Sequence, residues 1–202
     1  MPANRRENDH DRDMQWVRDF KAGDPSAFDH IVRNHKDRVF NLCYRFLGDV
    51  QEANDSAQET FIKVFTSLKR FRMESSFATW LYRITVNTCK NKRSSSHYRR
   101  RKRMVSLNPS GAEEKGNPVA TLEAKGPKPN GVLLRKEKMM LIQKAIDSLP
   151  ENQKSLIILR DMEGLSYDEI ALITGYPLGT VKSKLARGRM ALRDLLRGVI
   201  EK

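Results

Sequence analysis

Several features that would assign a protein to another class are scarce or missing in this sequence. No apolar run approaches the roughly 20 residues that a membrane-spanning helix needs. The only two cysteines, Cys43 and Cys89, match no metal-ligand or redox spacing, so we expect both to be reduced. The first residues (MPANRRENDHDRD) lack the apolar core of a secretory signal. We therefore expect a cytoplasmic protein that is not inserted in a membrane.

Signals for β-strands and for metal sites are also lacking. Apolar residues recur with helical period along most of the chain, and capping residues mark where the helices begin and end. His30 and His35 have no carboxylate or thiol at a spacing typical of a metal site. The sequence predicts an all-α protein with no metal and no cofactor.

Positive charge is abundant, and its placement is informative. The formal net charge is +13. Residues 1–89 are nearly balanced, whereas residues 90–103 (KNKRSSSHYRRRKR) hold 8 cations and no acid. A basic block beside a balanced domain, with a second basic helix downstream, favours two contacts to one polyanion such as DNA. The alternative is a disordered solubilising run. An acidic membrane surface is disfavoured because the block lacks an apolar face.

The segment 165–196 predicts a short helix, a tight turn and a longer helix. Ser166 and Glu169 form a capping box at the start, and Gly175 with Pro177 ends the first helix. The second helix, starting near residues 177–179, has an apolar side and a cationic side. Its inward positions are Val181, Leu185, Leu192 and Leu195 or Leu196, and its outward positions are Lys182, Lys184, Arg187, Arg189 and Arg193. This pattern favours a helix-turn-helix that enters the DNA major groove over an ordinary helical hairpin.

A helix over residues 49–70 carries an acidic stripe. Asp49 and Glu52 predict a capping box, and with Asp55 and Glu59 they recur every three or four residues along one side. Such a stripe is either solvated surface or a docking face for a basic protein partner. The residues alone do not separate these two readings.

The helix that follows, over residues 77–93, has polar side chains suited to nucleic acid. Arg83, Asn87, Lys90 and Asn91 share its outward face, and Trp80 lies at the seam. Amides, a guanidinium and aromatics together favour contact with bases held out of a duplex. The alternative treats Trp80 and Tyr82 as packing residues. The basic block beyond this helix predicts phosphate contacts that carry no sequence information, by Lys92, Arg93, Arg99, Arg100 and Arg101.

A proline- and glycine-rich stretch separates two helical domains. Residues 104–132 hold four of the eight prolines and four of the eleven glycines, which is typical of an extended linker. We therefore expect domains at 1–103 and 133–202, because so long a connection is unusual inside one compact domain. The second domain includes a predicted capping box at Ser148 and Glu151.

Three segments together resemble one protein family. They are DSAQETFIKVF (55–65), FATWLYRITVNTCKN (77–91) and SLPENQKSLIILRDMEGLSYDEIALITGYPLGTVKSKLARGR (148–189). In this order they resemble bacterial sigma factors of the extracytoplasmic-function type, closest to the envelope-stress members. The resemblance implies that the first domain binds the promoter −10 element and core RNA polymerase. It implies that the second domain binds the −35 element.

The resemblance also implies roles for individual residues. Contacts to the −10 element, including a flipped base, are expected from Phe71, Trp80, Arg83, Asn87, Lys90 and Asn91. Contacts to the −35 element are expected from Thr180, Lys182, Ser183, Lys184, Ala186 and Arg187. Docking on the coiled coil of the largest polymerase subunit is expected from Asp55, Gln58, Glu59, Phe61 and Lys63.

The implied partners are core RNA polymerase (its largest-subunit coiled coil and its flap), promoter DNA as duplex and melted strand, and an anti-sigma factor. Two other functions remain as alternatives. A dimeric activator would use the helix-turn-helix but leave the acidic stripe and the asparagine-bearing helix without a role. A DNA-processing enzyme would need converging carboxylates or an activated serine, and neither is indicated, so we expect no enzymatic activity.

Overall fold

The computed structural model describes residues 3–95 and 140–200, and within these ranges the secondary structure is helical with no strand. The chain divides into two compact units, residues 1–110 and 111–202. The predicted all-α architecture of two helical units is confirmed. The predicted linker, both of its boundaries and the residues Arg99, Arg100 and Arg101 lie outside the described residues.

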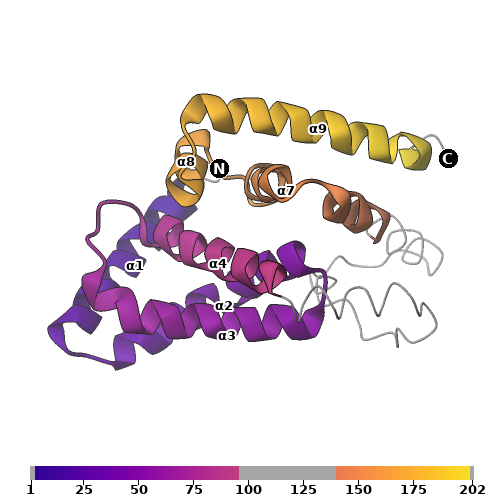
Figure 1. The fold of residues 1–202 in the computed structure, drawn as a ribbon. Coiled ribbons are helices and arrows are strands. Elements are labelled where there is room, and N and C mark those ends of the chain that lie inside the picture. The colour runs from indigo at the N-terminus through magenta and orange to yellow at the C-terminus, as the bar shows by residue number, and fades with distance from the viewer. Residues whose placement is uncertain (1–2, 96–139, 201–202) are drawn as a thin grey trace, which may run out of the picture. The chain divides into compact units, whose positions relative to one another are not determined.

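The first unit is built around its second helix (Figure 1). Its elements are α1 (Ala3–Ala22), α2 (Ser26–Leu47), α3 (Val50–Ser67), the 3-10 helix η1 (Leu68–Arg70) and α4 (Phe77–Ser94). Helix α2 packs against α1, α3 and α4, and α3 also packs against α4. The core between them contains the fully buried side chains of Ile31, Leu42, Phe46, Val64, Phe77 and Leu81. This packing fixes the outward faces of α3 and α4 on one rigid body.

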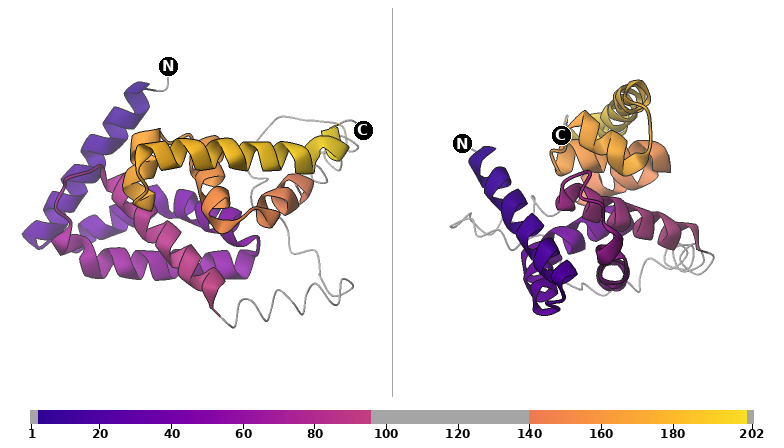
Figure 2. Two further views of the ribbon diagram at one scale, coloured as in Figure 1. Left: turned by 45° about the horizontal axis from the view of Figure 1, so that its top comes forward. Right: turned by 90° about the vertical axis from the view of Figure 1, so that its left-hand side faces the viewer.

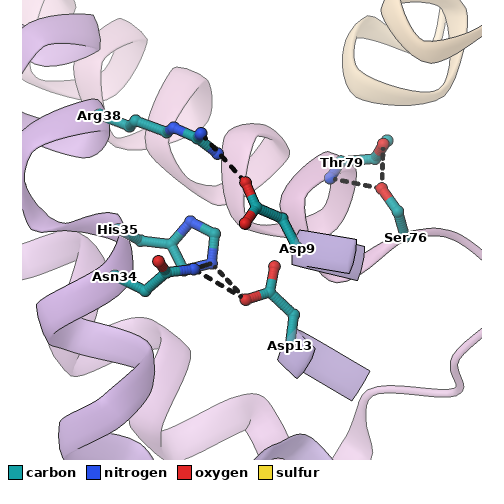
Figure 3. A network of polar contacts seen from close by, with 7 residues as sticks. All are labelled: Asp9, Asp13, Asn34, His35, Arg38, Ser76 and Thr79. Atoms are coloured by element: carbon teal, nitrogen blue, oxygen red, sulfur yellow. Dashed lines mark hydrogen bonds and ion pairs between the residues drawn. The ribbon is translucent and has the colours of Figure 1, made fainter. Parts of the chain in front are cut away.

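A buried polar contact joins α1 to α2 (Figure 3). The His35 Nε2 atom lies 2.9 Å from a carboxylate oxygen of Asp13, and the Asn34 amide donates to the same oxygen at 3.1 Å. Both His35 and Asp13 are almost completely buried. His35 therefore takes part in helix packing, and the described residues contain no group of three or more His, Cys, Asp or Glu placed to hold a metal ion.

The second unit contains the predicted helix-turn-helix (Figures 1 and 2). Residues 140–148 are helical and precede α7 (Glu151–Ile157), the π-helical turn η4 (Ile158–Met162), α8 (Tyr167–Thr174) and α9 (Leu178–Ile200). Helix α9 packs on α7 and α8 through Val181 and Leu185, which are buried. Further along α9, Leu195 is 49% exposed. The apolar side expected of this helix is therefore covered mainly in its first half.

Helix ends follow the sequence signals at several positions. Gly48 after α2 and Gly175 after α8 both adopt a φ of 73°, and their N–H groups donate to the carbonyls of Tyr44 and Ala171. A left-handed conformation costs glycine little because it has no Cβ. Ser166 and Glu169 form the predicted capping box, with both reciprocal hydrogen bonds present.

Two predicted capping boxes are wrong. The Asp49 side chain accepts from the Glu52 N–H, but the Glu52 side chain turns away and pairs with Lys92 of α4. Ser148 donates its hydroxyl to the Ala145 carbonyl instead of capping α7, whose N-terminal cap is Pro150 with no side-chain bond. At Asp49 only the reciprocal bond of the capping box is replaced. The Glu52 carboxylate is buried between two helices, and there it pairs with Lys92.

Candidate nucleic-acid interface

Helix α4 presents a polar outward face. Arg83, Asn87 and Asn91 are exposed at intervals of four residues, and Lys90 beside them is partly exposed. Ser76 starts the helix by accepting a hydrogen bond from the Thr79 N–H at 3.1 Å. Guanidinium and amide groups spaced one turn apart can hydrogen-bond the edges of bases that have left a duplex.

The aromatic residues expected to stack on bases are instead part of the core. Phe71 and Trp80 are 4% and 9% exposed, and their rings stack on each other with centroids 4.8 Å apart. Tyr82 is 7% exposed. Trp80 and Tyr82 are therefore packing residues in this structure, and Phe71 packs on Trp80. Their burial arises because Phe77 lies against both rings, which the spacing along one helix does not reveal.

The loop between η1 and α4 is held in a constrained conformation. Met73 adopts a φ of 57°, which is uncommon for a residue with a Cβ. The Lys21 ammonium of α1 donates to the Phe71 carbonyl at 2.5 Å. Backbone strain of this kind persists where surrounding contacts fix it, and such residues cluster at binding sites. The loop that leads into α4 thus has a defined shape.

Lys92, which was expected to contact phosphates, pairs with acids of α3 in this structure. Its Nζ atom lies 2.8 Å from the Glu52 carboxylate and 3.9 Å from that of Asp55. The hydrogen bond to Glu52, opposed by partial burial, raises the pKa of Lys92. The Glu52 side chain is only 4% exposed, and breaking a buried ion pair by removing one partner typically costs about 3–5 kcal/mol. An exposed ion pair contributes only about 0.2–1 kcal/mol. Lys92 is thus paired with Glu52, and its phosphate contact stays a prediction.

Arg93 is likewise turned inward. Its guanidinium donates to the Phe46 carbonyl at the end of α2, at 2.9 Å. This bond supplies a donor to one of the last carbonyls of α2, which have no partner within the helix. Two of the five residues predicted to contact phosphates thus bond to other helices of this unit: Lys92 to α3 and Arg93 to α2.

The outward face of α3 carries the residues expected to dock on polymerase. Asp55, Gln58 and Glu59 are exposed, and Phe61 and Lys63 are partly exposed. The Lys63 ammonium lies 2.6 Å from Glu59 and donates to the Thr88 hydroxyl of α4 at 3.2 Å. Lys63 therefore spans α3 and α4 as well as lying at the docking face.

Two apolar side chains on α3 were missed. Ile62 is 65% exposed, and Phe65 is 48% exposed although its ring contacts those of Phe20 and Phe28. Ile62 follows Asp55 by seven residues and Glu59 by three, so the helical period places it near the acidic stripe. This spacing could have identified it in the sequence. A face that combines exposed acids with exposed apolar groups favours docking of a protein partner over the alternative of a merely solvated surface.

The second helix of the helix-turn-helix exposes most of the predicted reading residues. Lys182, Ser183, Ala186 and Arg187 are exposed on α9, and Thr180 and Lys184 are partly exposed. The Lys184 ammonium lies 5.4 Å from the centre of the Tyr176 ring, a cation–π contact that ties it to the turn. These side chains lie in the first half of α9, the part that a recognition helix inserts into the major groove.

Arg189 differs from the other cations of α9. Its guanidinium donates two hydrogen bonds to the Asp161 carboxylate of η4, and this hydrogen bonding raises the pKa of Arg189. The sequence pattern placed Arg189 among the residues facing water. Arg189 is exposed as predicted, and it also links α9 to the preceding helical turn. No described helix is both long enough and apolar enough to cross a membrane.

Comparison with known proteins identifies both units. Residues 31–104 match Sigma-70 region 2, and residues 139–192 match Sigma-70 region 4. The chain is 36% identical over 190 residues to the RNA polymerase sigma-H factor of Pseudomonas aeruginosa, covering 94% of this chain and 96% of that protein. The chain belongs to the extracytoplasmic-function sigma factors. It is also 37% identical over 182 residues to the ECF RNA polymerase sigma factor SigW of Bacillus subtilis, covering 90% of this chain and 95% of the relative.

Solved structures agree with this assignment. The structure of CnrH in complex with the cytosolic domain of CnrY matches with a TM-score of 0.67 at 19% identity, over 93% of this chain and 98% of that one, which supports the fold. The sigma factor RpoE in complex with the anti-sigma factor NepR from Bartonella quintana matches with a TM-score of 0.59 at 25% identity, over 84% and 96%. This sigma factor binds core RNA polymerase and directs promoter-specific initiation of transcription.

Proposed function

We propose that this sigma factor divides promoter recognition between its two helical units, with α4 holding melted bases of the −10 element and α9 holding the −35 duplex. The observation that carries the proposal is the pair of exposed polar faces on separate compact units. One face contains Arg83, Asn87 and Asn91, and the other contains Lys182, Ser183 and Arg187.

Opening of the promoter follows from capture of bases at α4. Each base that leaves the stack costs a few kcal/mol in unstacking and unpairing. Hydrogen bonds from Asn87, Asn91 and Arg83 to the exposed base edges offset part of that cost. The constrained loop around Met73 leads directly into α4 and fixes where that helix begins.

The duplex contact differs in its chemistry. Helix α9 enters the major groove, where Lys182 and Arg187 donate to base edges or phosphates and Ser183 contributes a hydroxyl. A good bidentate contact to a base is worth about 1–3 kcal/mol of discrimination. Neither unit needs high affinity alone, since tethering raises the effective concentration of the second contact once the first has formed.

Docking on polymerase uses the outward face of α3. Asp55 and Glu59 supply negative charge to a basic partner surface, and Ile62, one turn further along α3, adds exposed apolar area. A surface with these acids repels DNA, so it separates the protein contact from the nucleic-acid contact. We place this activity in the cytoplasm, with no catalytic group and no cofactor.

We also propose an inhibitory protein partner. Two structures similar in fold are complexes, one of CnrH with the cytosolic domain of CnrY and one of RpoE with the anti-sigma factor NepR. By likeness to these complexes, an anti-sigma factor would bind this chain and prevent its use by polymerase.

Transcription in vitro from a random promoter library, with core RNA polymerase and the full chain, tests the proposal. We expect enrichment of promoters with two separated conserved blocks. Arg187→Ala should relax selection of the upstream block alone, and Arg197→Ala, an exposed cation further along α9, serves as the matched control. Absence of initiation at any promoter would contradict the proposal. Strong DNase protection by the protein without polymerase would favour a self-sufficient activator.

A further inference from the structure

Two lysines bridge the docking helix to the base-reading helix. Lys92 of α4 pairs with Glu52 of α3 at 2.8 Å, and Lys63 of α3 donates to Thr88 of α4 at 3.2 Å. Glu52 and Thr88 are 3% and 1% exposed. Each bridge therefore ends on a buried group of the facing helix, while the Lys92 and Lys63 side chains themselves are 26% and 42% exposed.

The bridged positions directly follow the reading positions. Asn87 precedes Thr88 and Asn91 precedes Lys92, so each asparagine is about 100° around α4 from a position tied to α3. On the α3 side, Asp55 lies 3.9 Å from the Lys92 ammonium and Glu59 lies 2.6 Å from that of Lys63. Each bridge thus contacts a predicted polymerase-docking acid at one end and a predicted reading turn at the other.

We propose that Lys92 and Thr88, with their partners Glu52 and Lys63, are positioning residues for promoter opening: they fix the rotation of α4 on α3, so that docking of α3 on polymerase aims Asn87 and Asn91 at the melted strand. This inference rests on the proposed function of the two helix faces. It assigns Lys92 to the geometry of the unit and away from the DNA backbone.

Burial of the Glu52 carboxylate and the Thr88 hydroxyl explains why charge-assisted hydrogen bonds are used here. Apolar side chains hold two helices together but tolerate small rotations, because dispersion contacts are non-directional and cores can repack. A charge-assisted hydrogen bond inside a low-dielectric seam has a preferred direction and length. Two such bonds one turn apart on α4 leave little freedom for rotation about its axis.

Four variants of the full chain test this. Lys92→Met breaks the first bridge, and Thr88→Val removes the acceptor of the second while leaving Lys63 free to turn to water. Lys92→Arg conserves the first bridge. The exchange Glu52→Lys with Lys92→Glu restores it with reversed polarity. Lys36→Met, an exposed lysine on α2, is the control for loss of one charge. Core RNA polymerase binding is measured by fluorescence anisotropy, and opening by permanganate reactivity on a promoter fragment selected by the wild type.

We expect Lys92→Met and Thr88→Val to bind core polymerase within about twofold of wild type and to lower opening, by about tenfold for Lys92→Met. Lys92→Arg and the charge exchange should recover most of the opening. Unchanged opening in both Lys92→Met and Thr88→Val would overturn the inference, as would equal loss of polymerase binding and opening. Where thermal melting shows Lys92→Met to be unfolded, Thr88→Val decides.

A phosphate contact at Lys92 predicts a different result. The charge exchange would then open promoters no better than Lys92→Met, and the dependence of DNA binding on salt would lose about one unit of slope in both. That outcome rejects the positioning role while leaving the two-unit model intact. If the wild-type chain itself neither binds core polymerase nor opens any promoter, the proposed function fails instead.

Discussion

The Arg189 guanidinium of α9 grips the Asp161 carboxylate of η4 through two hydrogen bonds, one from Nε at 3.1 Å and one from a terminal nitrogen at 2.5 Å. The contact spans 28 residues of sequence and sets α9 against the turn that precedes the helix-turn-helix. The side chains are 49% and 35% exposed, so water and salt screen the pair.

This exposure predicts a small effect on stability. Asp161→Asn should lower the free energy of unfolding by no more than about 1 kcal/mol, because exposed ion pairs contribute about 0.2–1 kcal/mol even with good geometry. The difference from wild type should shrink further in high salt. Urea unfolding at two salt concentrations measures both quantities. A loss several times larger would mean that the pair is far less hydrated than its exposure indicates.

Close packing of α9 on α7 predicts that Gly188 does not tolerate alanine. A Cβ at this position would lie 3.3 Å from Gln153 Cβ and 3.3 Å from Ile157 Cγ1, and Ile157 is only 1% exposed. The crowding should outweigh the gain of up to about 1 kcal/mol that alanine offers in a helix interior. Thermal melting should therefore show Gly188→Ala to be destabilised.

Gly179→Ala provides the matched control, because a Cβ there meets nothing within 4 Å. It should be neutral or raise the melting temperature. If the two variants melt alike, the distance between α7 and α9 does not limit the residue at 188.

The turn before α2 predicts a dependence of stability on pH. The Asp24 carboxylate accepts hydrogen bonds from the hydroxyl and the N–H of Ser26, and these bonds lower the pKa of Asp24 below 3.8. A carboxylate whose pKa is lower in the folded state stabilises the fold above its unfolded pKa, and the effect is lost as pH falls through the folded value. Asp24→Ala should thus be less stable than wild type at pH 7, with the gap closing below about pH 4.

Chemical unfolding across this pH range measures the gap. The substitution Asp29→Ala, at an exposed acid in the first turn of α2, controls for general charge effects at the same helix end. A gap that widened toward acid pH would contradict the assignment of the hydrogen bonds to Asp24.

The base-capture role predicts a split between two activities. Asn87→Ala removes an exposed amide from α4 without touching the core, so binding of core polymerase should change little. Opening of the −10 region should fall because a captured base loses one hydrogen-bonding partner. A pull-down with core enzyme and a permanganate footprint measure the two quantities. Asn41→Ala, which removes an amide from α2, is the control. Equal loss of both activities would count against base capture at α4.

Local signals in the sequence determined where most helices of this sigma factor begin and end. Gly48 and Gly175 stop helices because only a residue without Cβ enters the left-handed region cheaply, and Ser166 starts α8 through bonds within four residues. Helical period likewise put Asn87 and Arg187 on outward faces, since spacing along one helix decides which residues share a side.

Only the tertiary structure decided the partners of long side chains. Lys92 reads as a phosphate contact within its basic block, yet it pairs with Glu52, forty positions earlier, because α3 and α4 bury that carboxylate between them. The stacking of Phe71 on Trp80 likewise depends on tertiary packing, because it brings a loop residue against a helix residue in the core. Periodicity is a property of one helix, whereas burial and ion pairing depend on which helices meet and at what rotation. That rotation is the quantity the sequence pattern does not contain.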